Sequence, residues 1–145
     1  MNKFKRVFIA VDGGPSSENL AQAGLELAEQ LKAEVSVLLV VDTRTILGTE
    51  GLSVGEAIAI ERGSAAGNLK ILIKNVFHHH PVSHYIVEGT PYEKILQFAK
   101  EWSADLIVVG THGRKGLSRL VLGSVAEKVA RHANIPVTII PVNHG

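Results

Sequence analysis

The sequence predicts an α/β fold, in which helices cover both faces of one open, five-stranded parallel sheet. Short apolar segments alternate with helical patterns along the chain. Most of these segments are apolar throughout, as strands buried on both faces are. Glycine follows three of them, at the strand ends where such sheets bind ligands. Strict alternation favours right-handed crossovers, so we interpret residues 1–145 as one domain.

Composition narrows the functions that this domain can have. The 145 residues are 46% hydrophobic and carry a formal net charge of +1, which provides no basic field for nucleic acid. Cysteine is absent, which is compatible with the cytosol. No segment approaches the roughly 20 apolar residues of a membrane span. We therefore expect a cytoplasmic protein that binds neither nucleic acid nor membrane.

The first βαβ unit occupies residues 7–41. Residues 7–11 form a β-branched, apolar strand that ends at Asp12, too short for a signal peptide. Gly13 and Gly14 break this strand, and Ser16 is the expected N-cap of the next helix. Residues 35–41 form a second buried strand. The helix between the two strands carries one apolar stripe, made of Leu20, Ala23, Gly24, Leu27, Ala28 and Leu31.

The middle of the chain predicts a long helix and an edge strand. Ser53 and Glu56 form a capping-box pattern at the helix start. Gly63 and Gly67 each cost about 1 kcal/mol relative to alanine, so we expect a kinked or mobile middle. Residues 82–87 alternate only partly between apolar and polar side chains, which indicates a position near a sheet edge.

Two shorter helices and two strands complete the pattern. Thr90, Pro91 and Glu93 predict an N-cap, a first helical residue and a capping box. This helix buries Tyr92, Ile95, Leu96, Ala99 and Trp102. The strand at residues 106–109 follows. The last helix shows a further capping box at Ser124–Val125–Ala126–Glu127, buries Val125, Val129 and His132, and stops near Asn134. The final strand runs from Val137 to Val142, at an edge.

The turn after the fourth strand has the residues of a phosphate site. Gly110 and Gly113 remove side chains where backbone approaches a ligand. Gly123 allows a phosphate to reach backbone N–H groups at the start of the last helix. The Ser124 hydroxyl either caps this helix or binds phosphate or a magnesium-bound water. Asp12 either accepts hydrogen bonds from a ribose, holds magnesium, or caps the helix that follows it.

Other polar residues have two readings each. Arg114 is the loop cation nearest Gly113 and either neutralises phosphate or is solvated. His112 is either a phosphate donor or a solvent-facing loop residue. The histidines at positions 78–80 fit a polar helix end better than a metal site, because they lack the spacing of a zinc helix motif. No catalytic residue and no protein metal site is assigned.

These motifs resemble the universal stress proteins that bind ATP. Gly110–Thr111–His112–Gly113, nine residues and then Gly123–Ser124 match the G-x-x-G, nine-residue, G-S signature of that family. The segments VDGGPSS, LLVVD and IPVTIIP match in the same order. The family opening is often D-x-S-x-x-S, and here Gly14 replaces its first serine. The resemblance implies a Rossmann-like sheet of order 3-2-1-4-5, related to the adenine nucleotide alpha hydrolases.

The resemblance also implies a ligand site and a partner. Adenosine would lie over the first two strand ends, and two copies would pair through Val137 to Val142. ATP is the expected ligand, with or without magnesium, and cyclic AMP is an alternative. The candidate nucleotide-binding residues are Asp12, Gly13, Val40, Gly110, Thr111, His112, Gly113, Arg114, Gly123, Ser124 and Val125.

Two functional classes follow from this site. The first is a regulatory dimer in a stress response that binds ATP and hydrolyses it slowly or not at all. The second is an ATP-hydrolysing enzyme related to the ATP pyrophosphatases, whose S-G-G-x-D-S loop resembles residues 12–17 only distantly. No nucleophile and base are placed together by spacing, which favours the regulatory class. A protein that has lost its ligand and acts only by dimerisation is less consistent with the intact glycine pattern.

Overall fold

The computed structural model describes residues 3–111 and 122–142. Its strands are all paired in parallel, in the order β3-β2-β1-β4-β5, as predicted. Among the described residues, no helix is long and apolar enough to cross a membrane. The elements in chain order are β1 (Arg6–Val11), α1 (Ser17–Leu31), β2 (Glu34–Asp42), the 3-10 helix η1 (Thr43–Thr45), α2 (Val54–Phe77), β3 (Ser83–Gly89), α3 (Pro91–Glu101), β4 (Leu106–Gly110), α4 (Ser124–His132) and β5 (Val137–Ile140).

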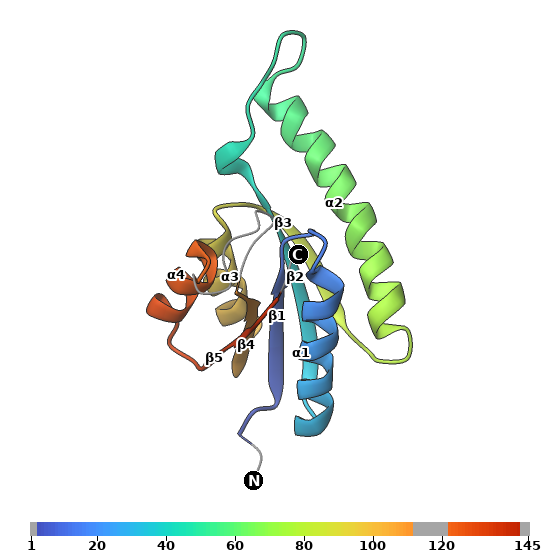
Figure 1. Ribbon diagram of the computed structural model, residues 1–145, viewed down its shortest axis with the longest axis vertical. Coiled ribbons are helices and arrows are strands. Elements are labelled where there is room, and N and C mark those ends of the chain that lie inside the picture. Colours follow the sequence, from blue (N-terminus) through green and yellow to red (C-terminus); the bar gives the residue numbers. More distant parts are fainter. Residues whose placement is uncertain (1–2, 112–121, 143–145) are drawn as a thin grey trace.

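Alternate side chains of the central strand β1 enter two hydrophobic cores. Val7, Ile9 and Val11 pack with residues of α1 and α2. Phe8 and Ala10 pack with residues of α3 and α4. Figure 1 shows the two helix pairs on opposite sides of the sheet. The period of two along a strand therefore assigns each apolar residue to one of two layers.

The buried face of α1 differs from the predicted stripe. Ala21 and Leu25 are buried, whereas Ala23 and Leu27 are only half-buried. Gly24 explains the rotation, because a Cβ atom on it would lie 2.5 Å from the Ile9 Cδ1 atom. The helix backbone lies directly against β1 at this glycine, and the buried face is centred on it.

Helix α2 forms without the expected kink. The predicted capping box is present, with the Ser53 hydroxyl accepting from the Glu56 N–H and the Glu56 carboxylate accepting from the Ser53 N–H. The helix runs unbroken through Gly63 and Gly67 and is straight in Figure 1. All of its buried side chains lie in its last turns, at Leu69, Leu72, Val76 and Phe77. Its first half projects beyond the sheet.

Two helix ends differ in detail from their predictions. Thr90 and Pro91 begin α3 as expected, but Thr90 makes no side-chain capping bond, so no capping box forms with Glu93. The fixed φ of Pro91 at the first helical position favours the helix start without that bond. Helix α4 ends at His132, which is exposed rather than buried, with its ring 5.9 Å from that of Tyr92.

Ser36 is a polar residue in the core. It is 0% exposed, it lies opposite Phe8 in the β1–β2 register, and its hydroxyl oxygen has no hydrogen-bond partner. Burying a hydroxyl without a partner costs about 1–3 kcal/mol in proteins.

We predict that Ser36→Ala raises the free energy of unfolding by about 1 kcal/mol, because it removes the desolvated hydroxyl. Urea denaturation measures the change. Ser83→Ala is the matched control, since Ser83 is paired with Ser36 in the sheet but is only half-buried, and it should change stability little. A loss of stability in Ser36→Ala would show that the hydroxyl has a partner.

Candidate functional site

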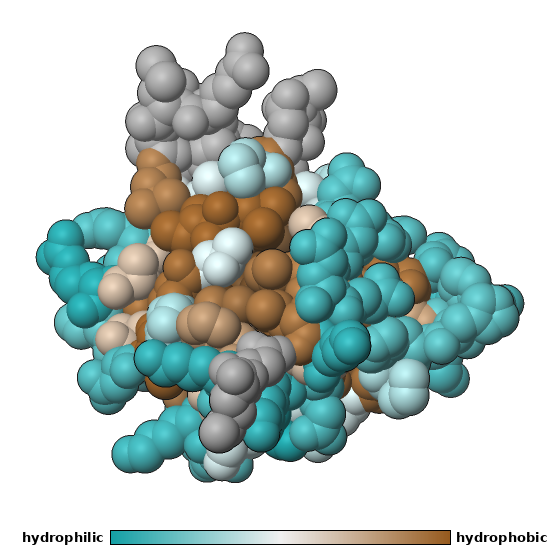
Figure 2. Space-filling model, turned by 90° about the horizontal axis from the view of Figure 1, so that it is seen from below, coloured by the Kyte–Doolittle hydropathy of each residue, from teal (hydrophilic) through white to brown (hydrophobic). Residues whose placement is uncertain are grey.

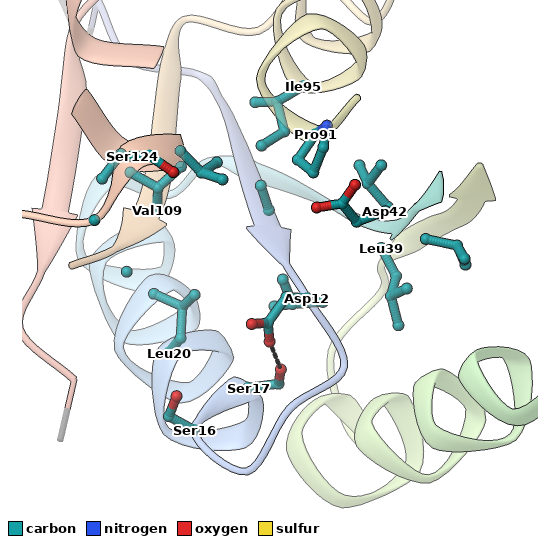
Figure 3. Close-up of a pocket in the computed structure, with 18 of the residues that line it drawn as sticks. Asp12, Ser16, Ser17, Leu20, Leu39, Asp42, Pro91, Ile95, Val109 and Ser124 are labelled. Atoms are coloured by element: carbon teal, nitrogen blue, oxygen red, sulfur yellow. Dashed lines mark hydrogen bonds between the residues drawn. The ribbon is translucent and has the colours of Figure 1, made fainter. Parts of the chain in front are cut away.

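A cavity of about 450 Å³ lies at the carboxyl ends of β1, β2 and β4 (Figure 3). Strands β1 and β4 are neighbours, so the loop after Val11 and the turn after Val109 border the same space. The volume is within the range of small-molecule sites, roughly 300–1,000 Å³. Of the predicted site residues, the structure brings together Asp12, Val40, Gly110, Thr111, Gly123, Ser124 and Val125 as lining residues.

Asp12 is held in place by the loop that follows it. Its Oδ1 atom accepts hydrogen bonds from the Gly14 N–H at 2.8 Å and from the Ser17 hydroxyl at 3.2 Å. Its Oδ2 atom is buried and has no hydrogen-bond partner among the described residues. A buried carboxylate oxygen without a donor is costly, so this side chain has unused capacity to accept a hydrogen bond beside the cavity.

Ser17, not Ser16, organises this loop. Ser16 precedes α1 as predicted but makes no side-chain capping bond. The Ser17 hydroxyl instead accepts from the Gly13 N–H at 3.1 Å while donating to Asp12. Gly13 has φ +81°, a left-handed conformation that favours glycine and turns the chain sharply after the strand.

Gly13 itself does not line the cavity. It lies on the other side of the loop, where it borders a separate hollow of about 320 Å³ between this loop and α2. Leu39 and Ser17 line both spaces. The predicted role of Gly13 is therefore conformational in this structure, since it shapes the loop that presents Asp12.

The turn after β4 is fixed by main-chain bonds around Thr111. The Thr111 N–H donates to the Ile140 carbonyl at 3.0 Å, and the Gly123 N–H donates to the Thr111 carbonyl at 2.6 Å. The Val142 N–H donates to the Thr111 hydroxyl at 3.1 Å. A Cβ atom on Gly110 would lie 3.2 Å from the Val142 side chain. Gly110 therefore permits close packing as well as lining the cavity.

The start of α4 is one residue earlier than predicted. Gly123 is the N-cap and Ser124 the first helical residue, so the capping box that would have Ser124 as N-cap does not form. Glu127 is ion-paired with Arg131 one turn further on. The helix N-terminus has no side-chain cap, and residues 123–126 line the cavity. Unpaired N–H groups at a helix start are suited to an anion.

Three predicted site residues, His112, Gly113 and Arg114, lie outside the described residues. Within residues 3–111 and 122–142, no group of three or more His, Asp or Glu side chains is placed to hold a metal ion.

The cavity also contains residues that sequence reasoning missed. Asp42 ends β2 and makes two hydrogen bonds with the Arg44 guanidinium, at 2.9 and 2.7 Å. These hydrogen bonds raise the pKa of Arg44 and hold its guanidinium beside Asp42 at the cavity wall. Pro91 and Ile95 of α3 add apolar wall. A carboxylate directly after a strand, as at Asp12, is the signal that would have identified Asp42.

Comparison with known proteins identifies one family. The model of the universal stress protein family matches residues 3–141. Universal stress protein MJ0531 of Methanocaldococcus jannaschii is 36% identical over 143 residues, which cover 96% of this chain and 83% of that protein.

Solved structures agree with this match. The structure of MJ0577, also from Methanocaldococcus jannaschii, has a TM-score of 0.83 at 28% identity and 99% coverage of both chains. A universal stress protein from Archaeoglobus fulgidus, solved in complex with dAMP, shares the fold with a TM-score of 0.60 at 23% identity. This match covers 97% of this chain and 99% of that one.

The loop geometry gives a paired prediction. Ser17→Ala removes both hydrogen bonds of the hydroxyl and leaves the Gly13 N–H without that acceptor, so we expect it to lower the free energy of unfolding by about 1–2 kcal/mol. Ser16→Ala removes a hydroxyl without a capping bond and should cost clearly less. Thermal or urea unfolding of both variants measures the difference. A larger loss in Ser16→Ala would contradict the described loop.

Proposed function

The chain belongs to the universal stress protein family, and from this premise we propose that it binds ATP in the cavity and acts as a nucleotide-dependent regulatory protein in a stress response. The observation that carries the proposal is the start of α4, which opens on the cavity without a side-chain cap. Backbone N–H groups at such a position bind phosphate groups, and the helix dipole adds to the attraction. The dAMP complex of a relative supports an adenine nucleotide in this fold.

The other end of the cavity suits a nucleoside. Val40 of β2 and Ile95 of α3 supply apolar surface for a base. The unpartnered Oδ2 atom of Asp12 supplies an acceptor for a ribose hydroxyl. Apolar walls with a few placed polar groups are typical of such sites. The phosphates would then extend toward Gly123 and Ser124.

Magnesium fits this arrangement only together with the nucleotide. The described residues offer no cluster of three ligands, and magnesium commonly takes one or two carboxylates plus phosphate oxygens. Asp12 is the carboxylate that fits, because one of its oxygens has no partner. The ion would supply neutralisation of phosphate charge.

We propose that hydrolysis is slow or absent. The described cavity wall contains three carboxylates, Asp12, Asp42 and Glu61. Asp42 is paired with Arg44, and one oxygen of Asp12 is held by the loop, so neither is placed as a free general base for activating water. This favours the regulatory class over the ATP-hydrolysing enzyme.

Calorimetric titration with ATP, ADP, AMP and cyclic AMP, each with and without magnesium, tests the ligand. ATP should bind most tightly, because it places most negative charge at the start of α4. If none of the four nucleotides binds the folded protein, the proposal is wrong. If cyclic AMP binds more tightly than ATP, then cyclic AMP, the alternative candidate, is the ligand.

Gly123→Val tests the phosphate position. The Gly123 backbone has φ −64° and ψ 153°, which valine also adopts, so the added bulk is the main change. We expect ATP affinity to fall by more than about tenfold. Ser124→Ala should cost less, because the N–H groups remain. Retained affinity in Gly123→Val with a native circular dichroism spectrum would show that the phosphates lie elsewhere. If the valine variant does not fold, Gly123→Ala is used for the same titration.

We further propose that two copies pair through β5. This strand is at the sheet edge, and its residues are all half-buried. The carbonyls of Pro136 and Ile140 bond toward β4, so the main-chain groups of Val137 and Ile139 point to the free edge. The lower face of the molecule also carries apolar surface between hydrophilic flanks (Figure 2), a surface type that partners cover.

Ile139→Pro removes an edge N–H without removing a bond to β4, so it should weaken a β5 dimer by more than about tenfold while keeping the fold. Sedimentation velocity at micromolar concentration measures the mass, which should fall in Ile139→Pro relative to the wild-type chain. The control is Tyr85→Ala in the opposite edge strand, which should leave the mass unchanged. A wild-type protein that is only monomeric would contradict the proposal.

A further inference from the structure

The face of α2 that points away from the sheet is unusual for a solvent-exposed helix face. Ile60 is 61% exposed and Ile71 is 55% exposed. Both lie opposite the buried residues of the helix, because positions three, four, seven and eleven apart share a face. The exposed residues that complete this face are Glu56, Gly63, Gly67, Lys70 and Lys74. We call these seven residues the outer α2 face.

Contacts within the described part of the chain do not explain the composition of this face. Among residues 3–111 and 122–142, no atom lies within 4 Å of where a Cβ would be on Gly63 or Gly67. Each glycine disfavours the helix by about 1 kcal/mol relative to alanine, and each isoleucine leaves apolar area in water. Both costs are offset if another helix packs here, because glycines allow close backbone approach and isoleucines then become buried.

We propose that the outer α2 face binds the same face of a second copy, with the two helices antiparallel about a twofold axis that crosses this face at the level of Ala65, whose own side chain is directed toward the core. The face is self-complementary about this point. Gly63 and Gly67 lie at equal distances from Ala65, as do Glu56 and Lys74. The symmetry therefore pairs Glu56 with Lys74 of the partner subunit, and the reverse. A parallel pair would instead place like charges together.

The hollow beside α2 provides a receiving surface for this contact. It measures about 320 Å³ and is lined by Leu69, Ile71 and Leu72 of α2, together with the loop at residues 13–15. In the antiparallel pair, Ile60 of the partner subunit lies next to Ile71, at the rim of this hollow. The lining also includes the polar residues Ser17, Glu18 and Asn68, so the apolar contact is confined to the rim at Ile71. An apolar side chain packed at such a rim is removed from water on association.

The outer α2 face carries opposite charges at its two ends, so it is complementary to the same face of a second copy in the antiparallel orientation. Glu56 makes the end near the helix N-terminus acidic, and Lys74 makes the end near the C-terminus basic. The capping box uses one oxygen of the Glu56 carboxylate, and the side chain remains exposed. Antiparallel packing also opposes the two helix dipoles favourably.

Sedimentation velocity of Ile60→Asp tests the apolar contact. The measurement is made in the Ile139→Pro background, so that pairing through β5 does not contribute. We expect a dimer with native α2 and a monomer with Ile60→Asp. Leu47→Asp is the matched control, because Leu47 is 76% exposed and lies outside the outer α2 face, and it should remain a dimer. A monomer with native α2, or equal masses for the two aspartate variants, would overturn the proposal.

A charge exchange tests the antiparallel register. Glu56→Lys alone and Lys74→Glu alone should each dissociate at least about tenfold more readily than the parent. An equimolar mixture of the two variants should recover the dimer, because every pair then has opposite charge. Failure of the mixture to associate would rule out this register. Nucleotide titration and the effect of Ile139→Pro on the wild-type chain are separate readouts, so failure here leaves the proposed function untouched.

Discussion

The structure depends on the burial of one strand on all of its sides. Strand β1 pairs with β2 along one edge and with β4 along the other, and helices cover both of its faces. The chain leaves β1 toward one helix layer and leaves β4 toward the other. The loop after β1 and the turn after β4 therefore diverge at the point where the strand order reverses, and the cavity lies between them. The cavity is thus a consequence of how the sheet is wound, and its lining side chains determine its chemistry.

The opposite end of the sheet is closed by a compact network. The Arg6 guanidinium lies 4.0 Å from the centre of the Trp102 ring, donates to the Trp102 carbonyl and pairs with Glu34. Asp105 accepts from the main-chain N–H groups of Lys5 and Arg6. These contacts join the amino ends of β1, β2 and β4. The carboxyl ends carry no such closure among the described residues of the cavity, which leaves that end available for a ligand.

Much of this fold was predictable because its signals are local or periodic. Apolar runs gave the strands, and the family resemblance implied their order, which the structure confirms. Seven of the candidate site residues line one cavity. The errors arose where three-dimensional contacts decide. Gly24 sets the rotation of α1 through contact with Ile9. The N-cap of α4 is Gly123, whose N–H is fixed by a main-chain bond to Thr111. The Asp42–Arg44 pair needed the side-chain geometry to be recognised.

The loop at residues 12–17 is a shared wall. Ser17 and Leu39 line both the cavity at the strand ends and the hollow beside α2. If a nucleotide and a second copy occupy these two spaces, as proposed, this partition is the physical connection through which one occupancy would alter the other. Any preference of the nucleotide-filled chain for one state of assembly would then appear, by the same factor, as a preference of that assembly for nucleotide. A shared wall of this kind would connect the amount of a small molecule to quaternary state through a single loop.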